Sequence, residues 1–93
     1  IEVNPNQVSA WYNKGVTLAT NLGKPEEAIR CYDKEIEINP KHAPSWYNKG
    51  VILSNLGKHK EAIKCYDRAL EINLTHEKAR RKREQEKKAL KQA

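Results

Sequence analysis

The sequence predicts an all-α fold, an α-solenoid of two helix-turn-helix repeats plus a C-terminal capping helix. The main observation is internal repetition, since residues 11–16 recur as residues 46–51, and residues 31–33 recur as residues 65–67. Self-similarity at a period of about 34 residues is typical of solenoid proteins. Within each copy, apolar residues return every three or four positions, which is the spacing of one helix face.

The first helix of each unit is expected near residues 8–22 and 43–56. Each carries Trp, Gly and Leu at spacings of four and three, which places the three on one face. These residues are Trp11, Gly15 and Leu18, then Trp46, Gly50 and Leu53. A glycine inside a helix costs about 1 kcal/mol relative to alanine. Because the cost recurs at the same place, we expect the glycines to allow close packing against Ala28 and Ala62.

The second helix of each unit is expected near residues 25–39 and 59–73, after an Asn-Leu-Gly-Lys turn. Glycine is common just past a helix C-terminus, and Pro25 suits the first position of the next helix. Pro40 then stops that helix, because proline lacks the amide hydrogen that the helix needs. The expected buried stripe of the first copy is Ala28, Ile29, Tyr32 and Ile36.

The repeats divide the chain into four segments. Residues 1–5 match residues 36–40 in type, so they are interpreted as the end of a truncated preceding repeat. The first repeat is expected at residues 6–40 and the second at residues 41–74. Residues 75–93 form the basic capping segment.

The capping segment carries most of the net charge. Residues 77–93 hold eight Lys and Arg against three Glu, in a chain of formal net charge +6. Thr75 is a good N-cap, and the lack of Gly and Pro beyond it predicts a helix near residues 76–90 that projects from the body after Lys87. Repeat arrays need a terminal helix with one polar face, so capping is the favoured interpretation.

Nothing in the sequence points to catalysis. His42, His59 and His76 lie in expected turns without metal-ligand spacing, and no glycine-rich phosphate loop is present. We therefore expect no enzyme activity, no cofactor and no metal. Cys31 and Cys65 are interpreted as free, semi-buried thiols too far apart to bridge. No apolar run is long enough for a membrane span, and the expected location is cytoplasmic.

The order Trp, Gly, Leu, Ala, Tyr, Pro at this period resembles the tetratricopeptide repeat. The residues that carry the resemblance are Trp11, Gly15, Leu18, Ala28, Tyr32 and Pro40, then Trp46, Gly50, Leu53, Ala62, Tyr66 and Ala69. The resemblance implies a superhelix whose first helices line a concave groove that binds a protein or an extended peptide. The groove residues it implies are Ser9, Tyr12, Asn13, Val16, Thr20, Tyr47, Asn48, Val51, Asn55, Lys78 and Arg81.

Some co-chaperones of this family clamp a peptide carboxylate with Lys, Asn and Arg from three repeats. Asn48, with Lys78 and Lys82, matches part of that pattern. Tyr12 and Val16 occupy the positions of its first element. The resemblance therefore implies peptide binding without a complete carboxylate clamp.

Two other functions stay open. The chain could be a structural spacer or self-association module, including a weak homodimer through its open N-terminal end at residues 1–18. Nucleic-acid binding through the basic helix is the weaker alternative, because that helix has no aromatic residue for base stacking.

Glu35 departs from the family pattern, which places a small buried residue at this position. Because a buried carboxylate needs a partner, we expect a contact with Lys49 of the next repeat. Lys14 is the second candidate.

Overall fold

The computed structural model describes residues 5–20 and 23–92, except for the side chains of residues 5–9 and 92. These residues form five α-helices and no strand. The helices are α1 (Pro5–Thr20), α2 (Pro25–Ile38), α3 (Ala43–Asn55), α4 (His59–Ile72) and α5 (Glu77–Gln92). The all-α prediction is confirmed. Most of the segment assigned to a preceding repeat lies outside the described residues.

Proline and glycine set the helix ends as expected. Pro25 begins α2, and Gly57 after α3 has φ 81°, a left-handed conformation that glycine adopts without steric cost. The Lys58 amide donates to the Leu53 carbonyl at 2.8 Å, and the Gly57 amide donates to the Ser54 carbonyl at 2.9 Å. These two bonds are the pair that closes a helix at a C-terminal glycine.

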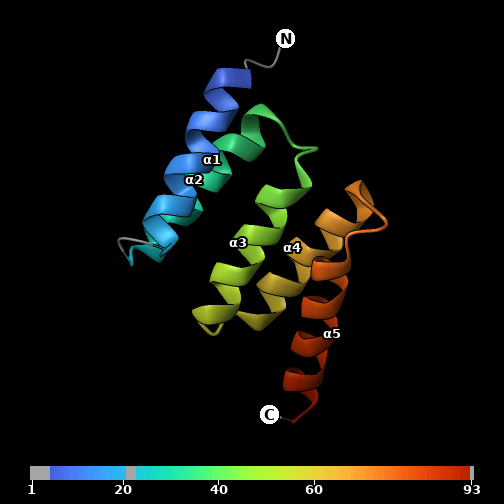
Figure 1. Cartoon of the computed structure of the whole chain (residues 1–93). Helices are drawn as coiled ribbons and strands as arrows, with labels where there is room; N and C mark the ends of the chain where they lie inside the picture. Colours follow the sequence, from blue (N-terminus) through green and yellow to red (C-terminus); the bar gives the residue numbers. More distant parts are fainter. Residues whose placement is uncertain (1–4, 21–22, 93) are drawn as a thin grey trace.

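The helices stack in chain order. α1 packs on α2, α3 on α4 and α5 on α4, with smaller contacts between α2 and α3 and between α3 and α5. Figure 1 shows α1, α3 and α5 on the near side of the molecule, with α2 and α4 behind them. The first helix of each unit and the terminal helix therefore share one face, as in a short α-solenoid.

A buried tyrosine lies at the centre of each helix pair. Tyr32 of α2 is 2% exposed and Tyr66 of α4 is 0% exposed. A Cβ on Gly15 would lie 3.0 Å from the Tyr32 ring, and a Cβ on Gly50 would lie 2.6 Å from the Tyr66 ring. The two glycines therefore make room for a tyrosine ring, and not for the alanines that the sequence suggested.

The buried stripe of α2 differs from the expected one. Its buried residues are Ala28, Cys31, Tyr32 and Glu35. Ile29 and Ile36, which were expected in the core, are only half-buried. Because α2 lies between α1 and α3, Ile29 packs at the edge of the core clusters of both units.

Glu35 is fully buried, but its partner is not a lysine. The Ser45 hydroxyl donates to its carboxylate, and His42 Nδ1 lies 2.6 Å from the other carboxylate oxygen. Burial raises the pKa of Glu35, while the contacts with Ser45 and His42 oppose that rise. The predicted contact with Lys49 is wrong, because Lys49 pairs at 2.6 Å with Asp33 and the segment before α3 places His42 beside Glu35.

α5 docks on the second unit partly through one small residue and one polar cluster. Ala79 is fully buried in a core cluster with Ala69 of α4. The Glu86 carboxylate accepts a hydrogen bond from the Ser54 hydroxyl and contacts Nδ1 of His59. A helix with a thin apolar stripe is therefore held partly by buried polar groups.

The N-cap of α5 is His76, not Thr75. The Ala79 amide donates to His76 Nδ1 at 3.2 Å, whereas the Thr75 hydroxyl donates to Asn73 Oδ1 at 2.9 Å. Thr75 is already bonded inside the preceding turn, so the next residue caps the helix. The helix itself continues past Lys87 to its end at residue 92.

Candidate functional site

A small hollow lies between α1 and α3, on the face that the first helices share. Its volume is about 140 Å³, and its walls are Val16, Ala19, Thr20, Tyr32, Asn48, Val51 and Ile52. Four of these were expected from the sequence, namely Val16, Thr20, Asn48 and Val51. Mostly apolar walls with a few polar groups are typical of sites that bind organic ligands.

Tyr12 and Asn48 connect the two helices at this hollow. Asn48 Nδ2 donates to the Tyr12 hydroxyl at 3.0 Å. The Tyr12 ring packs edge-on against Tyr32, with centroids 6.0 Å apart, and against His42, with centroids 5.3 Å apart. The half-buried Tyr12 ring is therefore held in place before any ligand arrives.

Tyr47 occupies the matching place one repeat later. Its ring centroid lies 5.9 Å from that of Tyr66 and 5.1 Å from that of His76. Both units therefore present a half-buried tyrosine that rests on a buried tyrosine and a histidine.

The hydroxyls of the two buried tyrosines meet different surroundings. Burial raises the pKa of Tyr32 to about 12, and a hydrogen bond with Asn48 opposes that rise. The Tyr66 hydroxyl is buried without a hydrogen-bond partner in the described part of the chain, and burial raises its pKa. Lys82 lies one repeat period after Asn48, so α5 carries a lysine at the position where α3 carries the Asn48 amide. The α3–α5 half of the face is therefore the more basic one.

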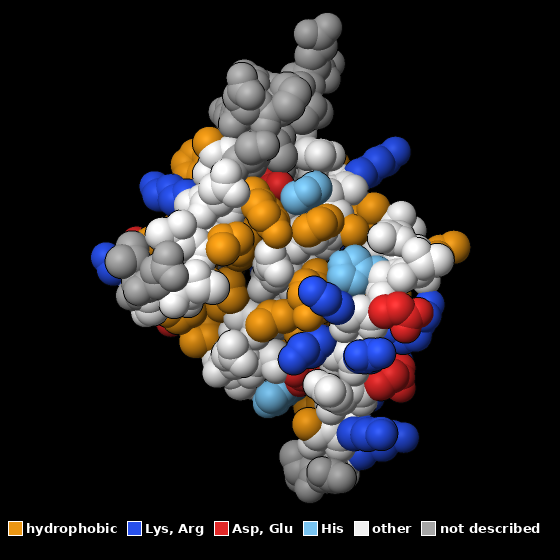
Figure 2. All heavy atoms as spheres, in the orientation of Figure 1, with side chains coloured by type: hydrophobic (Ala, Val, Ile, Leu, Met, Phe, Trp, Pro, Cys, Tyr) orange, Lys and Arg blue, Asp and Glu red, His pale blue; other side chains and the backbone are white. Residues whose placement is uncertain are grey.

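Positive charge gathers on the α5 side of the shared face. Figure 2 shows Lys and Arg side chains along α5, beside the apolar surface at the centre of the view. Lys78 and Arg81 are exposed, and neither forms an ion pair with a described residue. Arg80 and Arg83 on the same helix are paired, with Glu77 at 3.0 Å and with Asp67 at 3.1 Å.

The other predicted groove residues on α1 and α3 do not line the hollow. Asn13 and Asn55 are exposed on these helices. Thr20, which does line the hollow, donates its hydroxyl to the Val16 carbonyl of its own helix at 2.7 Å. The Ser9 side chain lies outside the described residues.

Sequence reasoning missed His42 and His76 as neighbours of two predicted groove residues, Tyr12 and Tyr47. Each precedes a helix of the shared face, and their rings pack against Tyr12 and Tyr47. The two histidines stand one repeat period apart in the chain. That spacing is the signal that would have identified them.

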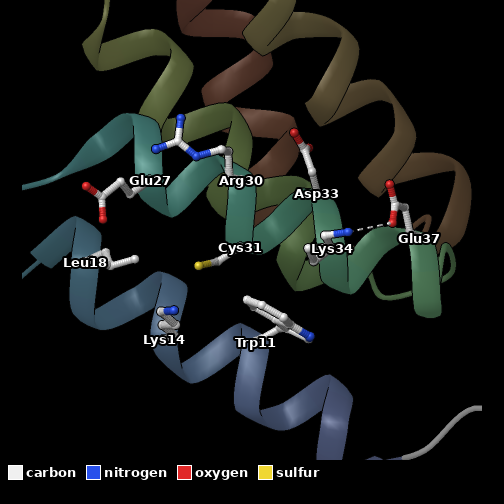
Figure 3. Close-up of a pocket in the computed structure, with 9 residues that line it drawn as sticks. All are labelled: Trp11, Lys14, Leu18, Glu27, Arg30, Cys31, Asp33, Lys34 and Glu37. Atoms are coloured by element: carbon white, nitrogen blue, oxygen red, sulfur yellow. Dashed lines mark ion pairs between the residues drawn. The ribbon is translucent and has the colours of Figure 1, made fainter.

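A second hollow, of about 380 Å³, lies between α1 and α2 and shares no lining residue with the hollow between α1 and α3. It is lined by Trp11, Lys14, Leu18, Glu27, Arg30, Cys31, Asp33, Lys34 and Glu37. Figure 3 shows Trp11 and Leu18 of α1 facing Cys31 of α2, with charged side chains around them. The floor is thus apolar and the surroundings are charged.

Two Ser-His-Glu clusters, each around a buried carboxylate, share the composition of a catalytic triad but not its geometry. In the first, Ser45 and Glu35 both contact Nδ1 of His42, whereas a triad uses one ring nitrogen for the carboxylate and the other for the nucleophile. Ser45 is also fully buried. In the cluster around Glu86, the serine contacts the carboxylate and not the imidazole.

The other chemistry of the described residues is limited. They contain no group of three or more His, Cys, Asp or Glu placed to hold a metal ion. None of the described helices is long and apolar enough to cross a membrane. Cys31 and Cys65 are free and buried in separate core clusters. Burial raises the pKa of Cys65 to about 11, which keeps this thiol protonated at neutral pH.

Helix pairs that stack in chain order, with their first helices on one shared face, define the class of helical-repeat solenoids. Two models with the description tetratricopeptide repeat match the chain, at residues 8–42 and at residues 43–76. The chain belongs to the tetratricopeptide-repeat family. No curated protein sequence matches it.

Solved structures agree with this fold. The first TPR of Spaghetti (RPAP3), bound to HSP90 peptide SRMEEVD, is 26% identical over 97% of this chain and 72% of that chain, with a TM-score of 0.89. The second TPR of the same protein, bound to the same peptide, is 24% identical over 92% and 79%, with a TM-score of 0.87. The TPR2AB-domain:pHSP90-complex of yeast Sti1 is 23% identical over 97% and 34%, with a TM-score of 0.89.

Proposed function

We propose that this protein is a non-catalytic scaffold that holds an extended acidic peptide in the groove of α1, α3 and α5. The hollow between α1 and α3 carries the proposal, because it joins apolar walls to the Asn48 amide beside the ring of Tyr12. The complexes of Spaghetti and Sti1 with HSP90 or its peptide support a peptide as the class of ligand.

The groove suits an extended backbone. The rings of Tyr12 and Tyr47 offer contact area with little side-chain entropy to lose, because their neighbours already hold them. Asn48 carries an amide that can donate to one backbone group and accept from another. A pre-organised surface of this kind loses less free energy on binding than a mobile one.

The charge of α5 determines which peptide the groove prefers. Lys78 and Arg81 are exposed on this helix, and Lys82 beside them is half-buried. Cations at one end of an apolar groove favour carboxylates of a ligand at that end. Because α5 has no aromatic residue on which a base could stack, an acidic peptide is favoured over a nucleic acid.

A titration with labelled SRMEEVD, followed by fluorescence anisotropy, tests this proposal. We expect saturable binding, and binding several-fold weaker for SRMKKVD, because single exposed charge contacts contribute up to about 1 kcal/mol. Asn48→Ala and Lys82→Gln should each weaken binding. Lys60→Gln is the matched control, because Lys60 is exposed on α4, outside the shared face.

The amidated peptide separates two modes of binding. Tyr12 and Val16 stand at the positions of the first clamp element, so we expect SRMEEVD with an amidated C-terminus to bind as well as the free acid. A strong preference for the free acid would show that a carboxylate clamp forms despite those residues. No saturable binding of SRMEEVD up to about 1 mM, equivalent to about −4 kcal/mol, would refute the acidic-peptide proposal.

Salt dependence separates the peptide from the weaker alternatives. Phosphate binding weakens steeply as salt rises, whereas a contact that is mainly apolar weakens little. A single-stranded oligonucleotide that binds more tightly than SRMEEVD, and that loses its affinity in salt, would favour nucleic-acid binding. A chain that binds neither would favour a structural spacer.

A further inference from the structure

Two histidines occupy equivalent places at the groove but make different contacts. His42 precedes α3 and His76 precedes α5, one repeat period apart. The ring of His42 packs against Tyr12, and the ring of His76 packs against Tyr47. Figure 2 shows histidine side chains beside the apolar surface at the centre of the view. The ring nitrogens of the two residues nevertheless meet different groups.

His76 caps a helix, and this contact fixes where its proton lies. The Ala79 amide donates to Nδ1 of His76 at 3.2 Å. A ring nitrogen that accepts a hydrogen bond carries no proton, so the proton of this ring is on Nε2. Protonation of Nδ1 would break the cap. His76 is therefore a neutral imidazole as long as it caps α5.

His42 stands at the same place before α3, but its side chain does not cap that helix. The Ser45 amide donates to the His42 backbone carbonyl instead, at 3.2 Å. Nδ1 of His42 lies 2.7 Å from Ser45 Oγ and 2.6 Å from a carboxylate oxygen of Glu35. Ser45 and Glu35 are both fully buried. The second unit has Ala79 and Ala69 at the equivalent positions, where neither side chain can form a hydrogen bond.

Ser45 shows which atom of this cluster carries the proton. Its hydroxyl has one proton, which is donated to Glu35, so the contact between Ser45 Oγ and Nδ1 of His42 requires a proton on Nδ1. A buried carboxylate also needs a compensating positive charge, and among the described residues the charge that acts on Glu35 is that of His42. The other titratable groups that face the cluster are the phenols of Tyr12 and Tyr32, which are never positively charged. These contacts favour an imidazolium at His42.

The His42 ring is partly exposed beside the proposed peptide groove. Its side chain is 31% exposed, and its Nε2 forms no hydrogen bond with a described residue. In an imidazolium, Nε2 is a donor as well. The Tyr12 ring, which packs edge-on against His42, accepts a hydrogen bond from Asn48 at the hollow. A charged His42 therefore places a cation at the α1–α3 end of the groove.

We propose that Glu35 and Ser45 hold His42 as a charged donor beside Tyr12, and that His42 binds an acidic side chain of the peptide. Glu35 and Ser45 are positioning residues, because they act on the ligand through the imidazole. The neutral His76 adds no such charge to the second unit. The role in binding rests on the acidic-peptide proposal above, whereas the proton state of His42 does not.

Nitrogen-15 NMR of the imidazole rings in the whole chain at pH 7 tests the proton state without any peptide. We expect both ring nitrogens to carry protons in His42, and Nε2 alone in His76. Glu35→Ala combined with Ser45→Ala gives the first unit the residues that already pack around His76 in the second. In this double variant His42 should lose its Nδ1 proton and cap α3, while His76 serves as the internal reference. A neutral His42 in the parent chain, or a His42 spectrum that the double variant leaves unchanged, would overturn the proposal.

Anisotropy titrations of the same double variant test the role in binding. It should bind labelled SRMEEVD about two- to five-fold more weakly than the parent chain, as expected for the loss of one exposed charge contact, and its affinity for SRMKKVD should not fall. His76→Asn is the matched control, because asparagine can also cap a helix, and it should leave the ratio of the two affinities unchanged.

Two results would overturn the role in binding. An equal loss of affinity for both peptides in the double variant would show that Glu35 and Ser45 maintain the shape of the groove and not its charge. A parent chain that carries both protons on His42 but does not bind SRMEEVD would refute the acidic-peptide proposal, and with it the role of His42 in binding, while the proton assignment would stand.

Discussion

The close approach of Gly50 to the Tyr66 ring gives the sharpest test of the packing. Substitution of Gly50 by alanine would place a Cβ 2.6 Å from Cε1 and 2.9 Å from Cδ1 of the Tyr66 ring. Contacts this short between carbons are repulsive. Tyr66 is fully buried in a core cluster, so its ring can move only by displacing other core residues. The equivalent Cβ on Gly15 would lie 3.0 Å from the Tyr32 ring, which is the milder case.

Two opposing effects set the size of the change. Alanine gains about 1 kcal/mol over glycine inside a helix, and overpacking of a core costs about 1–3 kcal/mol. For Gly50→Ala we expect the clash to win by about 1 kcal/mol, which lowers the melting temperature by about 4–8 °C in a domain of this size. For Gly15→Ala the two effects should nearly cancel.

Thermal unfolding followed by circular dichroism measures both variants, with Gly15→Ala as the matched control. Gly50→Ala combined with Tyr66→Leu should show a favourable coupling free energy, because the smaller side chain removes the clash. If Gly50→Ala stabilises the chain as much as its helix propensity predicts, the tyrosine ring is not what requires the glycine.

Three further predictions concern the buried groups. Tyr66→Phe should be neutral or stabilise the fold by up to about 1 kcal/mol in urea denaturation, because its hydroxyl is unpaired in the described part of the chain. Tyr12→Phe should instead cost about 1 kcal/mol through the lost bond from Asn48. Burial raises the pKa of Tyr32 from 10.0 to about 12, so the hydroxyl loses its proton at a lower pH in the unfolded chain than in the folded one. The melting temperature should therefore be steady below pH 10 and fall between pH 10 and 12. A melting temperature that stays constant over that range would contradict the burial argument. Burial raises the pKa of Cys65 to about 11. Its thiol should therefore react with Ellman's reagent at pH 8 far more slowly in buffer than in urea. Equal rates would show that Cys65 is accessible to solvent in the folded chain.

The features that depend on neighbours along the chain were predictable from the sequence. The repeat period follows from repeated residue types, and Pro25 and Gly57 mark helix ends through backbone chemistry that acts within one turn. Tyr32 and Tyr66 recur at a core position of the repeat, so their burial could be predicted. Val16, Thr20, Asn48 and Val51 line one hollow, and it was the resemblance to the tetratricopeptide repeat that implied them as groove residues.

The features that depend on which side chains meet across helices were decided by the tertiary structure. The sequence shows Glu35 at a core position, but it does not show that the segment before α3 places His42 and Ser45 beside it while Lys49 turns to Asp33. A charged side chain has several candidate partners within reach, and their choice depends on distances that no repeat spacing contains.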